Sequence, residues 1–147
     1  MKFFLILLAI VSGAALPIQA ALNAKMGKVI EDPVYAALIS FVVGSLGLMA
    51  YVIAVKTDLT AISRTLDAHW SVWTAGILGA FYVTCVIILA PKLGVALTFG
   101  LVVTGQLGIS LIIDHYGFLG IPAHAINWPR IAGISLIIAG VTLIRKF

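Results

Sequence analysis

Two long apolar runs between positions 79 and 120, joined at Pro91-Lys92, constrain the fold of this chain more than any other feature. The short connection predicts a tight turn between them. Soluble cores rarely contain apolar runs of about 20 residues, the length that crosses a hydrocarbon core of about 30 Å at 1.5 Å per residue. The composition agrees, because 63% of the residues are hydrophobic and only 10% are charged. The sequence therefore predicts an all-α membrane protein.

The same criterion, applied to the whole chain, predicts one domain of five transmembrane helices. The first run also resembles a signal peptide, because Lys2 precedes an apolar stretch that ends in small residues at 20–21. Pro17 and Gln19 interrupt the supposed cleavage region, which favours a retained span. The expected spans are 3–22, 34–55, 70–90, 93–113 and 130–145.

A few polar side chains interrupt the predicted spans, and these are the candidates for a solute site. Gln106, Ser110 and Asp114 recur at every fourth position of the fourth span and share one helix face. Each polar group has a structural alternative, since an amide can hydrogen-bond across helices or lie at the membrane edge, and a tyrosine can simply pack. We expect one cavity between the first, third and fourth helices, and its solute-binding residues are predicted to be Gln19, Asn23, Tyr82, Thr84, Gln106 and Ser110.

Asp114 lies beside His115 at the C-terminal end of the fourth span. A helix dipole disfavours a carboxylate there by about 0.3–1 kcal/mol, so the acid needs a partner. His115, Arg130 or a backbone donor in the following loop could provide it. Two interpretations remain open: Asp114 marks the water boundary and caps the turn before Gly117, or it is partly buried and carries a coupling proton, with His115 as the second candidate for that role.

Other classes of function find little support in the sequence. There is no Ser-His-Asp set, no phosphate-binding loop and no metal-ligand spacing, so we expect no catalysis, no metal and no cofactor. The net charge of +4 does not indicate nucleic acid, because the basic residues lie singly in loops without an aromatic platform. Cys85 is the single cysteine and has no disulfide partner in the chain.

The basic residues give almost no information on orientation in the membrane. Five spans place the two termini on opposite sides, with four basic residues on one side and five on the other. A chain without this bias can insert both ways, and two opposed copies form an antiparallel pair. The two sets are Lys2, Lys56, Arg64 and Arg130 on the N-terminal side, and Lys25, Lys28, Lys92, Arg145 and Lys146 on the other.

Segments spread over nearly the whole chain carry a resemblance to a known family. The most specific combination is Q-x₃-N on the first span with GQ-x₃-S-x₃-DH-x-G on the fourth. On these motifs the chain resembles the YdcZ-like family, small bacterial inner-membrane proteins of the drug/metabolite transporter superfamily. The matching segments are GAALPIQAALNAKMG (13–27), SFVVGSLGLM (40–49), GILGAFYV (76–83), PKLGVALTFGLVVTGQLGISLIIDHYGFLG (91–120) and RIAGISLIIAGVTLI (130–144).

The resemblance implies half of a ten-helix inverted-repeat transporter, completed by a second copy or by an oppositely oriented paralogue. Small multidrug exporters of this superfamily carry a glutamate in the first span, where this chain has Gln19 and Asn23 and no acid. We therefore expect a secondary transporter of a small polar metabolite, neutral or zwitterionic, that works as an antiparallel dual-topology homodimer by alternating access. One alternative is a non-transporting scaffold or assembly partner that binds through small-residue rows such as Ala36, Ser40 and Gly44. A channel is the other.

Overall fold

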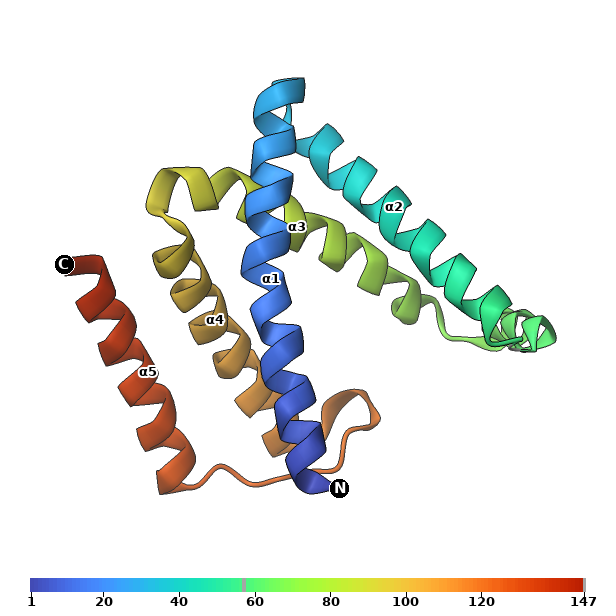
Figure 1. The fold of residues 1–147 in the computed structure, drawn as a ribbon. Coiled ribbons are helices and arrows are strands. Elements are labelled where there is room, and N and C mark those ends of the chain that lie inside the picture. Colours follow the sequence, from blue (N-terminus) through green and yellow to red (C-terminus); the bar gives the residue numbers. More distant parts are fainter. Residues whose placement is uncertain (57, 147) are drawn as a thin grey trace. The chain divides into compact units, whose positions relative to one another are not determined.

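The computed structural model describes residues 1–56 and 58–146, and most of these are helical, with no strand among them (Figure 1). Five helical segments of the described residues are long and apolar enough to cross a membrane, which confirms the predicted all-α membrane class. The chain forms two compact units, unit 1 (Met1–Pro91) and unit 2 (Lys92–Phe147). In chain order the elements are α1 (Lys2–Ile30), α2 (Pro33–Ala54), η1 (Leu59–Asp67), η2 (Trp70–Trp73), α3 (Thr74–Leu93), α4 (Val95–Tyr116), η3 (Phe118–Gly120) and α5 (Trp128–Lys146).

Helix α1 is longer than the predicted span, because it continues from position 22 to Ile30. Lys25 and Lys28 were expected in a loop, but lysine is a good helix former and its long side chain can reach water from the last turns of a span. The residue after the helix, Glu31, is its C-cap and has a left-handed backbone with φ of 63°. The polar segment after the first span is therefore mostly helix.

The turn into α2 is fixed by local capping. Asp32 is the N-cap, and its carboxylate Oδ1 accepts hydrogen bonds from the backbone N–H groups of Val34 at 2.6 Å and Tyr35 at 3.2 Å. Pro33 occupies the first helical position, where its missing N–H costs nothing and its fixed φ suits the helix. Helices α1 and α2 diverge from this turn (Figure 1).

The core of unit 1 lies near that turn. Ala36, Ala37 and Ile87 are buried together, and Val83 packs against them. The predicted small-residue row is only partly a packing row, because a Cβ added at Gly44 would find no atom within 4 Å. The reason is the divergence of α1 and α2, which brings small residues into contact near the turn and leaves a gap further along.

The break between α3 and α4 falls at Gly94, and the predicted turn at Pro91-Lys92 is wrong in position. Pro91 and Lys92 are the third- and second-last residues of α3, which ends at Leu93. Gly94 has a φ of 83°, a value that glycine adopts at little cost and other residues do not. A proline, by contrast, has a helix-compatible φ and loses only one hydrogen bond near a helix end.

Unit 2 consists of α4 and α5, joined by the loop that contains η3. Helix α4 ends at Tyr116 and is capped by Gly117, whose φ is 64° and whose N–H donates to the carbonyl of Ile113. The two helices approach closely at Gly100, where an added Cβ would lie 2.8 Å from Cγ2 of Val141. Val141 is buried. Gly100 is thus the small residue that permits this contact.

Candidate solute-binding sites

Unit 1 contains a cavity of about 250 Å³ between its helices, which we call the amide pocket. Gln19 contributes the amide from α1, α2 contributes two serines, and α3 contributes one apolar side chain. No ionisable side chain is among the described residues that line it. The lining residues are Gln19, Ser40, Phe41, Gly44, Ser45, Leu48 and Val83.

The serines of the amide pocket keep their hydroxyl groups free. A serine or threonine inside a helix commonly bonds back to a carbonyl three or four residues earlier. Ser12 does so in α1, donating to the carbonyl of Ala9 at 3.0 Å, and Ser135 does so in α5. Ser40 and Ser45 form no hydrogen bond with the described part of the chain. Their hydroxyls are therefore available to a solute or to water.

Asn23 lies one helical turn from Gln19 on α1 and is buried, with 6% of its surface exposed. Its Nδ2 has no hydrogen-bond partner among the described residues. A buried donor without a partner costs about 1–3 kcal/mol. Asn23 does not line the amide pocket itself.

Tyr82 and Thr84 flank the α3 residue that does line the amide pocket. Both are partly buried, but Val83 between them is the side chain that reaches the pocket. Consecutive residues of a helix point about 100° apart, so neighbours of a lining residue face elsewhere. The role of Tyr82 and Thr84 as solute ligands stays a prediction.

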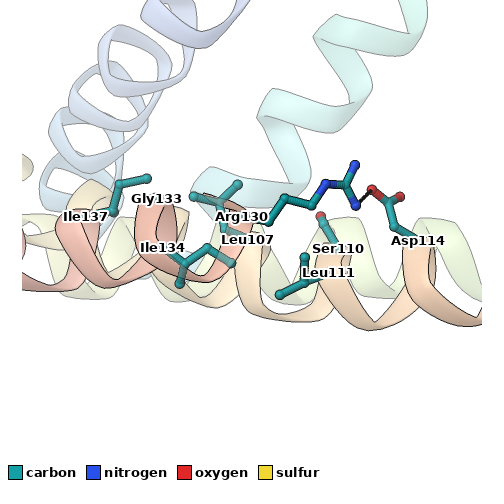
Figure 2. Close-up of a pocket in the computed structure, with 8 residues that line it drawn as sticks. All are labelled: Leu107, Ser110, Leu111, Asp114, Arg130, Gly133, Ile134 and Ile137. Atoms are coloured by element: carbon teal, nitrogen blue, oxygen red, sulfur yellow. Dashed lines mark ion pairs between the residues drawn. The ribbon is translucent and has the colours of Figure 1, made fainter. Parts of the chain in front are cut away.

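Unit 2 contains a second cavity, of about 330 Å³, between α4 and α5, which we call the ion-pair pocket (Figure 2). Ser110 and Asp114, two members of the predicted polar row, both line it. Gln106 and His115 do not, and both are exposed. The lining residues are Leu107, Ser110, Leu111, Asp114, Arg130, Gly133, Ile134 and Ile137.

Asp114 is paired with Arg130, one of the partners expected from the sequence. Nη1 of Arg130 lies 3.2 Å from Oδ2 of Asp114, and the two side chains are 35% and 33% exposed, respectively. The same Nη1 donates to the carbonyl of His124 at 3.3 Å. The backbone N–H of His124 donates to the carbonyl of Asp114 at 2.7 Å. His124, in the loop before α5, thus bonds both to the guanidinium of Arg130 and to the backbone of Asp114.

His115 contacts the loop before α5 and a neighbouring aromatic ring. Its Nδ1 accepts a hydrogen bond from the backbone N–H of Ile126 at 3.2 Å, and its ring packs edge-on against Tyr116. His115 therefore holds the loop before α5. Its predicted part in proton coupling stays a prediction.

Ser110 differs from the other hydroxyl residues of α4. Thr98 and Thr104 donate to the carbonyls four residues earlier, at 2.8 and 2.9 Å. Ser110 makes no hydrogen bond with the residues that the structure describes, so its hydroxyl is free at the pocket wall. Gln106 belongs to unit 2 and Gln19 to unit 1. The cavity predicted to join these two amides stays a prediction.

The sequence does not identify three polar residues of the pockets as site residues. The spacing of Ser40 predicts a packing row, and no spacing pattern singles out Ser45. Arg130 was considered only as a partner for Asp114. A signal was present for the serines, since Ser40 and Ser45 follow the capped start of α2 at the depth where Gln19 interrupts α1. Rows of small residues and polar pockets have the same spacing, so spacing alone does not separate them.

Five helical segments of the described residues that are long and apolar enough to cross a membrane define a small polytopic membrane protein. The model of the family described as "Putative inner membrane exporter, YdcZ" matches residues 4–143, and the chain belongs to this family. It is similar to the inner membrane protein YdcZ of Escherichia coli (strain K12), with 25% identity over 138 residues that cover 93% of this chain and 91% of that protein. No solved structure matches the chain.

The family assignment confirms the resemblance seen in the sequence and the location in the inner membrane. The family description names a "Putative inner membrane exporter", which agrees with the predicted class of transporter.

Proposed function

We propose that this protein is a secondary transporter that moves a small polar solute, neutral or zwitterionic, across the inner membrane by alternating access. The observation that carries the proposal is the amide pocket, an open cavity where one amide and two free hydroxyls meet between helices long and apolar enough to cross a membrane. Polar groups without partners are costly in a membrane, and those that persist commonly serve a pathway or a site.

The chemistry of the amide pocket favours an uncharged or internally neutral solute. Amides and hydroxyls both donate and accept hydrogen bonds, and they carry no net charge. Helix α1 contains no acidic residue, so it offers no carboxylate that could exchange a proton for a cationic solute. Asn23, with its buried free donor one turn away, would supply one further hydrogen bond if the helices shift during transport.

We further propose that two copies in opposite orientations, or one copy with an oppositely oriented paralogue, form the working unit. The support is the count of four and five basic residues on the two sides of the spans. Sites between inverted repeats recur in secondary transporters. A C-terminal tag should be accessible from both sides of the membrane in comparable amounts, and moving two lysines to one side should bias it. A single fixed orientation would overturn the antiparallel homodimer.

The transport proposal is tested with purified protein and a panel of neutral, zwitterionic and charged metabolites. A solute of the transported class should raise the melting temperature, and it should enter proteoliposomes with saturation. Gln19→Leu should abolish the flux, whereas Ser12→Ala, on the same helix but bonded to its own backbone, should retain it.

The outcomes separate the alternatives. Flux that stays proportional to concentration, with ohmic current, would indicate a channel. Neither stabilisation nor flux with any member of the panel would contradict transport and favour a scaffold that binds another membrane protein.

A further inference from the structure

The ion-pair pocket has a positive and a negative pole, each built from a side chain and a helix end of the same sign. Arg130 is the third residue of α5, where the helix N-terminus carries a partial positive charge. Asp114 lies two residues before the end of α4, where the C-terminus carries a partial negative charge. Each side chain is therefore at the helix end that disfavours it. A ligand that brings an anionic group to Arg130 and a cationic group to Asp114 would offset both unfavourable interactions with the helix ends.

The side chains of Arg130 and Asp114 keep hydrogen-bond donors and acceptors that a ligand could use. Among the residues that the structure describes, the guanidinium of Arg130 contacts Asp114 and the carbonyl of His124, in both cases through Nη1. Arginine has five N–H donors in a planar fork, so several remain, and a carboxylate has two acceptor oxygens. Both side chains are about one-third exposed, so a ligand in the pocket can reach them. The free hydroxyl of Ser110 lies at the same wall.

The rest of the pocket is apolar. Figure 2 shows Arg130 and Asp114 turned toward each other at one end, with leucine and isoleucine side chains along the remainder. Gly133 widens the pocket, because a Cβ added there would find no atom within 4 Å. The volume of about 330 Å³ is at the small end of the range for ligand pockets. The apolar wall is formed by Leu107, Leu111, Ile134 and Ile137.

We propose that the ion-pair pocket binds a small zwitterion whose ammonium and carboxylate groups are carried on an apolar body, as in an amino acid with an aliphatic side chain. The carboxylate binds Arg130 at the N-terminus of α5. The ammonium binds Asp114 at the C-terminus of α4, and the aliphatic part lies along the leucine and isoleucine wall. This inference rests on the proposed function, because it names the class of solute that the transporter takes.

The test uses the full-length purified protein in phosphatidylglycerol nanodiscs and radiolabelled L-leucine as the probe. Saturable binding of leucine is expected. Isoamylamine, which lacks the carboxylate, and 4-methylpentanoate, which lacks the ammonium, should each compete at least ~10-fold less well, the factor for loss of one charge-assisted contact. Glycine, which keeps both charges and lacks the apolar part, should also compete poorly.

Variants locate the binding in this pocket. Arg130→Gln should lower leucine affinity at least ~10-fold, whereas Arg145→Gln, at the other end of α5, should not. Because the loss of Arg130 also breaks the ion pair, a second pair of variants leaves both charges in place. Gly133→Leu should fill the pocket and abolish binding. Gly140→Leu should leave binding unchanged, because that glycine also has open space around it but lies outside the pocket.

The outcomes distinguish this inference from the proposed function. Leucine binding that survives both Arg130→Gln and Gly133→Leu would overturn the assignment to this pocket. Binding and flux of a different solute, with no zwitterion bound, would overturn the inference and leave transport standing. A second nanodisc preparation contains phosphatidylethanolamine; if this lipid binds at Arg130 and no free zwitterion does, the pocket holds a lipid headgroup and the inference is wrong. Absence of binding and flux for the whole metabolite panel would overturn the proposed function as well.

Discussion

The two units differ in the kind of polar side chain that lines their pockets. The amide pocket of unit 1 uses Gln19, Ser40 and Ser45, which lie well inside their helices and carry no charge. The ion-pair pocket of unit 2 uses the full charges of Asp114 and Arg130, which lie within three residues of a helix end. The two chemistries therefore occur at different positions along their helices.

The difference follows from the cost of burying charge. A charged residue at the centre of a membrane-crossing helix costs about 2.5–3.5 kcal/mol on insertion scales, and the cost falls toward the interface. An amide or a hydroxyl costs much less. Depth along the helix thus selects neutral hydrogen-bonding groups for one pocket and permits a paired acid and base in the other.

The largest effect is expected when a charge is placed in the amide pocket. Gln19→Glu keeps the shape of the side chain and adds a carboxylate that no cation of the pocket can pair, so it should destabilise the protein by about 3 kcal/mol at neutral pH. Gln19→Met keeps the length without the charge and serves as the control. Equilibrium unfolding in mixed micelles measures both. If Gln19→Glu were as stable as Gln19→Met, depth would not explain the contrast between the pockets.

The next effect concerns packing in unit 2. Gly100→Ala places a Cβ 2.8 Å from Cγ2 of Val141, closer than atoms can approach, so it should cost about 1–3 kcal/mol. Gly105→Ala, on the same helix, meets no atom within 4 Å and should be neutral or slightly stabilising. Unfolding of both variants in micelles compares them. Adding Val141→Ala to Gly100→Ala should recover part of the loss, and no recovery would refute the contact.

Asn23 should show a trade between stability and function in unit 1. Asn23→Leu removes a buried donor that has no partner, so it should stabilise the protein by about 1 kcal/mol. If the donor serves the solute, the same variant should lower flux several-fold. Unfolding and proteoliposome uptake are measured on one preparation. Higher stability with unchanged flux would remove Asn23 from the transport pathway.

The smallest stability effect is expected for the ion pair itself. Asp114→Asn keeps the size of the side chain but cannot titrate, and a pair that is one-third exposed contributes about 1 kcal/mol or less. If Asp114 carries a coupling proton, the variant should lose the pH dependence of flux and its response to a proton gradient. Ser135→Ala, bonded to its own helix, is the control. A variant that keeps both responses would show that Asp114 is not the coupling site.

Much of the fold could be predicted from the sequence because five apolar runs of sufficient length allow few alternatives in a membrane. The ends of the helices were less predictable. Lysines near a span do not stop a helix, so α1 reaches Ile30. The helical conformation is interrupted between α3 and α4 at Gly94 rather than at Pro91. The strongest missed signal was Asp32-Pro33, an N-cap followed by a proline that marks the start of α2.

The candidate sites were less predictable than the fold, for a physical reason. The face shared by Ser110 and Asp114 follows from helical periodicity within one helix, and both residues do line one pocket. Which helix faces them is a tertiary property. Arg130 emerged only as one of several possible partners, and Ser40 could not be separated from its packing neighbours, because small residues serve close contact and open space equally well.

Solute counterflow in proteoliposomes tests the central claim most directly. Vesicles loaded with a high concentration of unlabelled solute are diluted into a trace of the labelled solute, and the internal label is followed over time. An alternating-access carrier predicts a transient accumulation of label above equilibrium, which Gln19→Leu abolishes and Ser12→Ala retains. Label that approaches equilibrium without an overshoot, or that matches empty vesicles, would contradict the account.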